Sequence, residues 1–155
     1  MGAETERTLV LVKPDGVQRR LVGEIVGRLE RKGLRLCAMR LLVLSEAQAA
    51  AHYAPHVGKP FYPGLIRFIT SGPIVAMVFE GPRAIGLVRA AMGATDPLNA
   101  APGSIRGDLA ADMGMNLVHG SDSPESAARE IANLFAPDEI VGQSLPDEAW
   151  VFGDA

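Results

Sequence analysis

Residues 8–16 read TLVLVKPDG, and the fold of the chain is best approached from this stretch. The first five residues are apolar or β-branched without polar alternation, which is typical of a strand buried on both faces. Lys13 stands at the end of that run, and Pro14 and Gly16 occupy positions that favour a turn. The sequence therefore predicts an interior strand over residues 8–12 and a turn over residues 13–16.

The same strand signal recurs along the chain, separated by segments with helical spacing. Apolar runs predict three more strands, over residues 34–44, 74–79 and 117–118. Helices are predicted over residues 21–32, from Ser45 to before Pro55, over residues 65–69, from Gly81-Pro82 to Met92, and from Ser123-Pro124 onward. Residues 93–103 are expected to form a long loop of the kind that is often functional, and residues after Pro137 an irregular tail.

This order of elements indicates the fold class. Four strands interleaved with helices predict an α+β protein in which the helices pack on one sheet. The order is compatible with a ferredoxin-like βαββαβ core, a four-stranded antiparallel sheet covered by helices, to which extra helices are added. A length of 155 residues without repeats or linkers predicts a single domain over residues 1–155.

Composition narrows the classes of function. Hydrophobic residues make up 48% of the chain and charged residues 21%, which indicates a globular rather than a disordered protein. A formal net charge of −3 argues against a broad nucleic-acid or anionic-membrane surface, because both need clustered positive charge. A few well-placed arginines would still suffice for a phosphate site.

The sequence shows no signal for export or for a disulfide. The single cysteine, Cys37, lies in an apolar stretch and is expected to be a small core residue rather than a nucleophile. The N-terminal residues lack a basic region followed by an apolar run, and no apolar run approaches the roughly 20 residues of a membrane span. We therefore expect a cytoplasmic protein without a membrane segment.

Residues 116–123, which read NLVHGSDS, hold the strongest candidate for chemistry. They place His119 at a strand end, beside a glycine, with polar residues leading into a helix. Side chains and free N–H groups meet ligands at such junctions. An imidazole, whose ordinary pKa is about 6.5, is a competent nucleophile near neutral pH. The alternative for any lone histidine is a surface or satisfied core residue, and we assign His52 and His56 to that alternative.

Two other chemistries have weak support. A metal site is disfavoured because the three scattered histidines and one cysteine lack a recognisable zinc spacing. A serine hydrolase is disfavoured because Gly120-Ser121 is not part of a G-x-S-x-G nucleophile elbow. A nucleophilic histidine remains the leading interpretation.

Three cations are candidates for a phosphate site. Lys13 ends the first strand, Arg89 lies on a sparsely charged helix, and Arg106 follows the long loop. Such groups hold phosphate oxygens by charge-assisted hydrogen bonds, although any single one is more commonly a solvated surface charge. Spacing alone does not bring them together, and the chain has no Walker A sequence, kinase-type glycine-rich loop or G-x-G-x-x-G.

Glu130 lies on the last predicted helix, a short way along the chain from His119. A carboxylate beside an imidazole fixes the orientation of the ring and raises its basicity. The alternative is a glutamate on a helix surface, which spacing alone favours.

Several separated segments resemble the nucleoside diphosphate kinase family. Residues 116–123 are similar to its active-site signature, and residues 8–16 to its first strand and turn. Further similar segments follow in family order: residues 60–65, 71–73, 75–78, 102–108 and 128–131. The resemblance covers roughly residues 6–152, and agreement over so many segments is far less expected by chance than one short motif.

The resemblance implies a kinase that moves the γ-phosphate of a nucleoside triphosphate to a nucleoside diphosphate by a ping-pong mechanism. His119 would be the nucleophile that becomes a phosphohistidine, Glu130 and Ser121 would orient and polarise it, and Lys13 would assist. Mg²⁺ is the implied cofactor, held mainly by the nucleotide phosphates. Asp122 is the nearest candidate protein ligand for the metal.

The resemblance also implies a set of nucleotide-binding residues. They are Arg89, Thr95 and Arg106 at the β- and γ-phosphates, Lys13, Tyr53 and Asn116 near the phosphate and sugar, and Phe61, Leu65 and Met113 around the base. Stacking on an aromatic ring accepts any base, because every base has a π-face. The implied substrates are therefore ATP and other nucleoside tri- and diphosphates, with broad base specificity.

The family is oligomeric, so a homo-oligomer is implied. The C-terminal segment with Trp150-Val151-Phe152 is more similar to that of its hexameric members than to its shorter tetrameric ones, which favours a hexamer. Two positions depart from the family pattern. Pro55 stands where an acidic residue is frequent, and Lys59 replaces a common arginine, so the rim of the nucleotide slot is expected to differ.

Two other classes compete with a kinase. A phosphohistidine carrier would share His119 but would need no base slot, and the presence of Phe61, Arg89, Thr95 and Arg106 speaks against it. A nucleic-acid-binding ferredoxin-like domain would need exposed aromatic residues on its sheet and a basic face. Aromatic residues make up only 5% of the chain and the strands are apolar, which disfavours that class.

Overall fold

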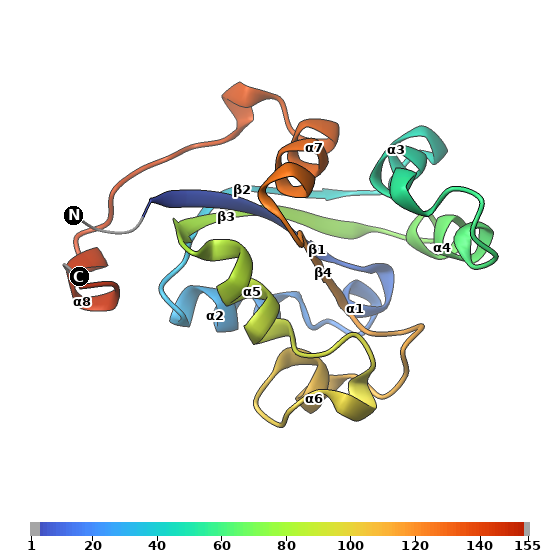
Figure 1. The fold of residues 1–155 in the computed structure, drawn as a ribbon, viewed down its shortest axis with the longest axis horizontal. Coiled ribbons are helices and arrows are strands. Elements are labelled where there is room, and N and C mark those ends of the chain that lie inside the picture. Colours follow the sequence, from blue (N-terminus) through green and yellow to red (C-terminus); the bar gives the residue numbers. More distant parts are fainter. Residues whose placement is uncertain (1–3, 154–155) are drawn as a thin grey trace.

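The computed structural model describes residues 4–153. Within these residues the protein forms a sheet of four strands. Its strands are β1 (Thr5–Val12), β2 (Arg35–Leu42), β3 (Ile74–Pro82) and β4 (Val118–Gly120). They lie in the order β2-β3-β1-β4, and every neighbouring pair is antiparallel. The α+β class and the four-stranded antiparallel sheet predicted from the sequence are therefore confirmed (Figure 1).

Strand β1 occupies the interior of the sheet. It pairs with β3 along its whole length and with β4 near its C-terminal end, where Leu11 lies opposite His119. The side chains of residues 8–12 are completely buried, as the uninterrupted apolar run predicts. The pairing with β4 places the candidate nucleophile directly beside the fully buried end of β1.

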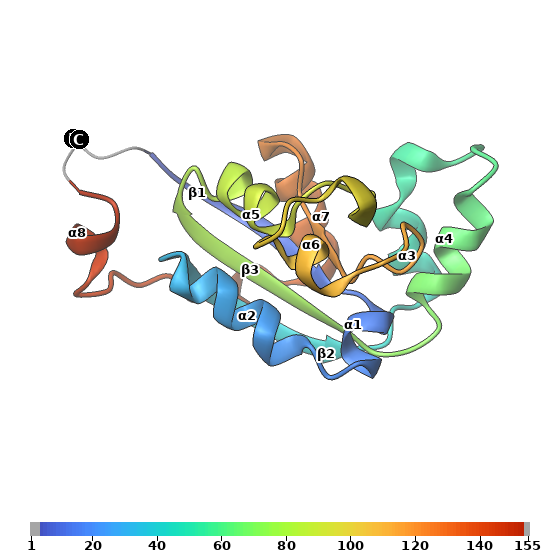
Figure 2. The ribbon, with the colours of Figure 1, turned by 90° about the horizontal axis from the view of Figure 1, so that it is seen from below.

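Helices cover both faces of the sheet. On one face lie α2 (Val22–Arg31), α5 (Ala84–Met92) and α6 (Ile105–Leu109), and on the other lie α3 (Glu46–His52), α4 (Tyr62–Ile69) and α7 (Pro124–Leu134) (Figures 1 and 2). Alternate residues of β1 serve the two cores: Val10 and Val12 pack with α2 and α5, whereas Leu9 and Leu11 pack with α3, α4 and α7. The sheet is therefore buried on both sides, which explains its unbroken apolar strands.

Two helix starts follow from capping side chains. Ser45 accepts a hydrogen bond from the backbone N–H of Gln48, and the Gln48 side chain accepts one from Ser45 N–H, which completes the predicted capping box of α3. Ser123 caps α7 by accepting a hydrogen bond from the backbone N–H of Ser126, with Pro124 at the first helical position. The start of α7 and the end of α3 border the cleft described below.

The structure corrects two local predictions. Residues 14–18 form a short helix, α1 (Pro14–Gln18), rather than only a turn, because Pro14 has the backbone angle that starts a helix. Gly81 and Pro82 belong to the end of β3, and α5 begins after Arg83, which has a positive φ of 54°. The left-handed backbone conformation of Arg83 turns the chain, so that the single residue Arg83 connects the end of β3 to the start of α5.

The loops contain short helical turns that periodicity did not reveal. The described part of the chain contains three 3₁₀ segments, at Ala54–His56, Pro97–Asn99 and Pro137–Glu139. The predicted irregular tail ends in a short helix, α8 (Glu148–Val151), on which the Trp150 side chain is 91% exposed.

The structure bears on two further expectations from the sequence, which concern Cys37 and membrane-spanning segments. Cys37 is buried, as predicted, and its thiol donates to Glu80 Oε2 at 3.0 Å. Burial and this carboxylate raise the pKa of the Cys37 thiol to about 12, so it is not a nucleophile near neutral pH. Within residues 4–153, the helices are all too short or too polar to cross a bilayer.

Gly107 on α6 provides a test of the packing. A Cβ at this position would lie 2.0 Å from the carbonyl oxygen of Ala101, a backbone atom that cannot move aside. We expect Gly107→Ala to lower the free energy of unfolding by about 2 kcal/mol or more. Gly86 on α5 is the matched control, because a Cβ there meets no atom within 4 Å and Gly86→Ala should be neutral or stabilising. Urea unfolding of both variants measures the difference, and equal effects would contradict the packing described here.

Candidate active site

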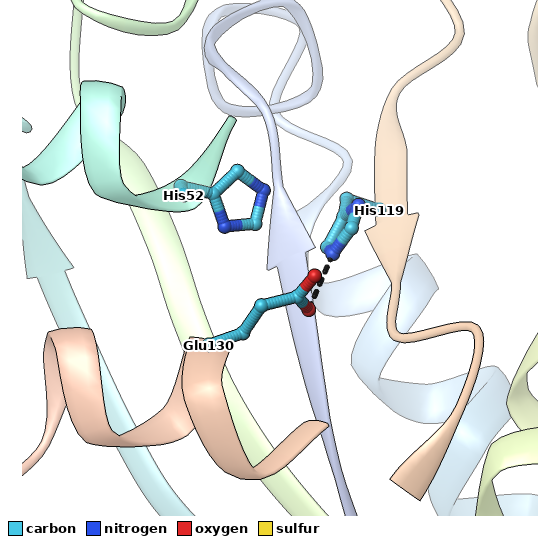
Figure 3. Close-up of side chains that lie close together, drawn as sticks. All are labelled: His52, His119 and Glu130. Carbon is cyan, nitrogen blue, oxygen red and sulfur yellow. Dashed lines mark hydrogen bonds and ion pairs between the residues drawn. The ribbon is translucent and has the colours of Figure 1, made fainter. Parts of the chain in front are cut away.

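His119 lies on β4 and contacts a buried carboxylate. Its Nε2 is 2.8 Å from Glu130 Oε1, a carboxylate on α7 that is only 5% exposed (Figure 3). Ser121 donates its hydroxyl to the same oxygen at 2.8 Å and accepts the backbone N–H of Leu9 at 3.2 Å. A continuous chain of hydrogen bonds thus runs from strand β1 through Ser121 and Glu130 to the imidazole.

The contacts of Glu130 determine which ring nitrogen is free. Burial raises the pKa of Glu130, but hydrogen bonds from His119 and Ser121 and the nearby imidazoles together lower it below its ordinary value. The carboxylate is therefore ionised near neutral pH and can only accept hydrogen bonds. Nε2 of His119 then carries the proton, and Nδ1 keeps the lone pair that a nucleophile needs.

His52 lies against His119, which was not expected from the sequence. The two rings meet edge to face with centroids 4.5 Å apart, and His52 is only 3% exposed. Burial, together with His119, lowers the pKa of His52 to about 3. Its Nδ1 is buried and has no hydrogen-bond partner among residues 4–153. His52 is therefore a core residue at the end of α3, one of the alternatives predicted, but this ring nitrogen is not satisfied. Its position next to Tyr53, a residue implied by the resemblance, was the only sequence signal available.

Arg106 is held in place by the backbone rather than by a carboxylate. Its guanidinium donates to the carbonyl oxygens of Val118 at 2.7 Å, Gly93 at 3.1 Å and Asn116 at 3.2 Å. Burial and the neighbouring Arg89 lower the pKa of Arg106 to about 10, so it stays charged at neutral pH. Three of the five N–H donors of Arg106 are used in this way. These bonds fix the orientation of the guanidinium, and because the acceptors are uncharged its positive charge is not neutralised.

Lys13 and Arg89 lie in the same cleft. Burial, followed by repulsion from Arg106, lowers the pKa of Lys13 to about 8. Arg89 is exposed and donates to the carbonyl oxygen of Gly120 at 3.3 Å, directly after His119 in the sequence. The fold therefore brings together the three cations that spacing alone could not place.

A cleft of about 730 Å³ contains these side chains. Every residue that the resemblance implied lines it, apart from Ser121, which is fully buried behind Glu130. The lining residues from that prediction are Lys13, Tyr53, Phe61, Leu65, Arg89, Thr95, Arg106, Met113, Asn116, His119, Asp122 and Glu130. The predicted site residues thus converge on one open cavity.

The mouth and floor of the cleft differ in character. Phe61 and Met113 are 52% and 58% exposed and border the opening together with Leu65. Asn116 lies deeper, donates its amide to the carbonyl oxygen of Thr95 at 2.9 Å, and has a buried Oδ1 without a partner in the described part of the chain. Apolar groups at the mouth and polar groups at the floor match a ligand with an aromatic and an anionic end.

Sequence reasoning missed several lining residues. His52, His56, Ser126 and Arg129 also border the cleft. Arg129 donates to the carbonyl oxygen of Ala51 at 2.9 Å, which ties α7 to α3 behind the site. Two positions, Pro55 and Lys59, differ from the family pattern. Pro55 lines the cleft. The Nζ of Lys59 lies 5.7 Å from the ring centroid of Phe61, which borders the cleft.

Comparison with known proteins identifies the family. The sequence profile described as "Nucleoside diphosphate kinase" matches residues 6–140. The chain is 58% identical to a nucleoside diphosphate kinase of Archaeoglobus fulgidus over 147 residues, which is 95% of this chain and 97% of the relative. The chain belongs to the nucleoside diphosphate kinase family. Members of this family are enzymes, and the chain is a nucleotide-using kinase of the same kind.

Further relatives agree with this assignment. A nucleoside diphosphate kinase of Frankia casuarinae is 64% identical over 132 residues, covering 85% of this chain and 96% of the relative. The solved structure of a halophilic nucleoside diphosphate kinase from Halobacterium salinarum in complex with CDP has a TM-score of 0.93 and 52% identity, and covers 96% of this chain and 99% of that one. A nucleoside diphosphate kinase family protein of Babesia bovis has a TM-score of 0.92 and 44% identity, with 95% and 99% covered.

The hydrogen bonds of Ser121 provide a test of the architecture behind the site. In Ser121→Ala the buried N–H of Leu9 loses its acceptor, and Glu130 loses a donor. We expect the free energy of unfolding to fall by about 1 to 3 kcal/mol. Ser71→Ala is the matched control, because the Ser71 hydroxyl donates only to the Phe68 carbonyl at an exposed helix end and its loss should cost less than about 0.5 kcal/mol. Denaturant titration compares the two, and a Ser121 variant as stable as the Ser71 variant would contradict this account.

Proposed function

We propose that this chain transfers the γ-phosphate of a nucleoside triphosphate to a nucleoside diphosphate through a phosphohistidine on Nδ1 of His119. The observation that supports this most directly is the bond between Nε2 of His119 and the buried carboxylate of Glu130 at the floor of the cleft. It leaves Nδ1 as the ring nitrogen with a free lone pair. Covalent catalysis of this type gives two similar half-reactions and ping-pong kinetics.

In the first half-reaction the Nδ1 lone pair attacks the γ-phosphorus. The bond between the γ-phosphorus and the bridging oxygen breaks, and the nucleoside diphosphate leaves with that electron pair. The imidazole gains positive charge as the N–P bond forms, and Glu130, bonded to Nε2, stabilises this charge. A second nucleoside diphosphate then takes the phosphate by the reverse path, which regenerates neutral His119 with its Nε2 proton in place.

The cations have separate roles in this proposal. Arg89, Arg106 and Thr95 hold the β- and γ-phosphate oxygens, and Lys13 assists near the phosphate and sugar. Phosphoryl transfer depends chiefly on positioning and on charge stabilisation. Support comes from the backbone carbonyls that fix Arg106, because a pre-arranged cation needs little reorganisation when phosphate charge shifts toward the bridging oxygen.

The mouth of the cleft suits a nucleoside. Phe61 would stack on the base, Leu65 and Met113 would flank it, and Tyr53 and Asn116 would face the sugar and phosphate. The related protein from Halobacterium salinarum was solved with CDP, which supports a nucleotide in this cleft. Since stacking does not select among bases, we infer broad base specificity.

Mg²⁺ is the proposed cofactor. The cleft offers an exposed carboxylate, Asp122, among several cations, and Mg²⁺ prefers oxygen ligands supplied largely by phosphates. Asp122 would hold the ion together with the nucleotide. When bound, Mg²⁺ would neutralise phosphate charge during transfer.

We further infer a homo-oligomer, with a hexamer favoured over a tetramer. Strand β2 is an edge of the sheet and carries exposed apolar side chains at Met39 and Leu41, which are 47% and 68% exposed. An exposed apolar edge strand is a common pairing surface. The exposed Trp150 offers a second apolar contact. A cytoplasmic location and a single domain over residues 1–155 remain predictions.

Phosphate uptake by the isolated protein tests the function directly. We expect the chain to take up an acid-labile label from γ-labelled ATP with Mg²⁺ and to pass it to GDP or dTDP, because phosphoramidates of histidine are acid-labile. His119→Ala should do neither, while keeping its circular dichroism spectrum and its affinity for ADP. Label that is taken up but not passed to any nucleoside diphosphate would favour a phosphate carrier. A wild-type chain that takes up no label would refute the proposal.

The depressed pKa of Lys13 predicts an alkaline limit. Its ammonium is charged below about pH 8 and is lost as the pH rises through that value, so attraction for nucleotide phosphates falls. We expect kcat/KM of the wild type to decrease above about pH 8, by up to tenfold per pH unit. Lys13→Arg keeps its charge in this range, so the decline should disappear from its profile, whatever its absolute activity. The same decline in both proteins would show that another group causes it.

A further inference from the structure

We propose that His52, His119 and Glu130 form a binding site for a divalent transition-metal ion of the Zn²⁺ type, and that occupation of this site blocks His119. One ring nitrogen of each histidine and one carboxylate oxygen of Glu130 lie within 4.8 Å of one another. Figure 3 shows the three side chains converging from different elements: His52 from α3, His119 from β4 and Glu130 from α7. This site lies behind the imidazole and differs from the place of a Mg²⁺ ion carried by nucleotide phosphates.

His52 is the residue that points to a metal. It is 97% buried, being only 3% exposed, and its Nδ1 has no hydrogen-bond partner within residues 4–153. A buried polar nitrogen without a partner has lost its hydrogen bonds to water and has gained none from the protein, which is unusual in a folded protein. The ring is wedged edge-on between Tyr53 at 4.8 Å and His119 at 4.5 Å, measured between ring centroids. An imidazole held so firmly beside two other metal-binding groups is suited to coordination.

The donor set selects the kind of ion. Two imidazoles and one carboxylate are the protein ligands of many catalytic zinc sites, which keep a fourth position for water. Mg²⁺ prefers six oxygen ligands and is a poor match for two nitrogens. Among divalent first-row metals, affinity for such nitrogen sites rises from manganese to a maximum at copper and is lower again for zinc. The cluster should therefore bind Zn²⁺ in the presence of a large excess of Mg²⁺.

The geometry requires a small closure. Ligand atoms about 2.0 Å from a tetrahedral zinc ion lie about 3.3 Å apart, so the widest separation in the cluster must shrink by roughly 1.5 Å. Nε2 of His119 and Oε1 of Glu130 are already 2.8 Å apart and would spread slightly around the ion. The hydroxyl of Ser121 would keep Glu130 oriented from behind. Arg129, whose Nη2 is 3.6 Å from Glu130 Oε2, repels a second cation and should weaken the affinity for the ion.

The effect on catalysis rests on the proposed function, although metal binding does not. A Zn²⁺ ion on Nε2 replaces the proton that His119 shares with Glu130, and this proton goes to solvent. The metal draws electron density from the ring, so Nδ1 becomes a weaker nucleophile. Glu130 is then committed to the ion and no longer stabilises an imidazolium. Phosphate uptake should stop, while the nucleotide, which contacts the other side of the cleft, still binds.

Calorimetric titration of the full chain with ZnCl₂, without nucleotide or Mg²⁺, tests the site. We expect one Zn²⁺ per chain, and at least tenfold weaker binding in His52→Asn and in Glu130→Gln. His56→Asn is the matched control, because His56 lies in the same cleft but outside the three-residue cluster, and its titration should equal that of the wild type. The circular dichroism of each variant is recorded, and two independent variants keep the test valid if one of them fails to fold.

The outcomes separate the metal site from the proposed kinase function. Absence of Zn²⁺ binding at submillimolar concentration, or unchanged binding in both folded cluster variants, would overturn the site even if ATP labels His119. Binding that is lost in His56→Asn would show an adventitious surface site and would overturn it equally. Zn²⁺ binding as described, with label uptake unaffected by the ion, would overturn the blockade. Failure of metal-free protein to take up label would instead count against the kinase mechanism alone.

Discussion

The ionised carboxylate of Glu130 is the group on which the arrangement of the site depends. A charge that is 95% buried is costly unless several donors compensate it, and here His119 and Ser121 donate to one oxygen while Arg129 faces the other. Ser121 is in turn bonded to the N–H of Leu9 in the fully buried part of strand β1. The most rigid part of the core thereby sets the orientation of the imidazole, which is what a nucleophile needs if its lone pair is to face the substrate.

The three cations of the predicted phosphate site, in contrast to Glu130, are not compensated by ion pairs within residues 4–153. Arg106 has no carboxylate partner among the described residues, and three carbonyl oxygens hold it through geometry instead. Lys13 and Arg89 stand close enough to influence it, so the free protein keeps mutually repelling charges in one place. This arrangement costs stability, and a polyanionic ligand relieves the repulsion when it binds. The pKa values of Lys13 and Arg106 are lowered first by burial and then by this repulsion.

Much of the fold follows from local interactions that can be recognised in the sequence, such as apolar runs and helix-capping residues. Residues 8–12 are apolar or β-branched throughout because both faces of β1 are covered there. The Ser45 capping box and Ser123-Pro124 mark helix starts by direct hydrogen bonding. The convergence of distant side chains on one cleft could not be predicted in this way. Nothing in the spacing brings Lys13, Arg89 and Arg106 together; the antiparallel pairing of β1 with β4 and the packing of α5 and α6 do so. The contact of His52 with His119 was not expected for the same reason, since β4 lies far from α3 in the sequence. The resemblance to a family supplied the site residues that elementary reasoning left open.

The shallow mouth of the cleft has a consequence for residence time. Phe61 is about half exposed even though it is the surface on which a base would stack, so only part of the contact area of a nucleoside can be removed from water there. An enzyme that uses one cavity for both donor and acceptor must empty it twice in every cycle, and each departure is slowed by whatever the base contributes to binding. A half-exposed platform keeps that contribution small and leaves most of the recognition to the phosphates. The openness of this aromatic residue therefore favours rapid exchange, at the expense of tight retention of any one nucleotide.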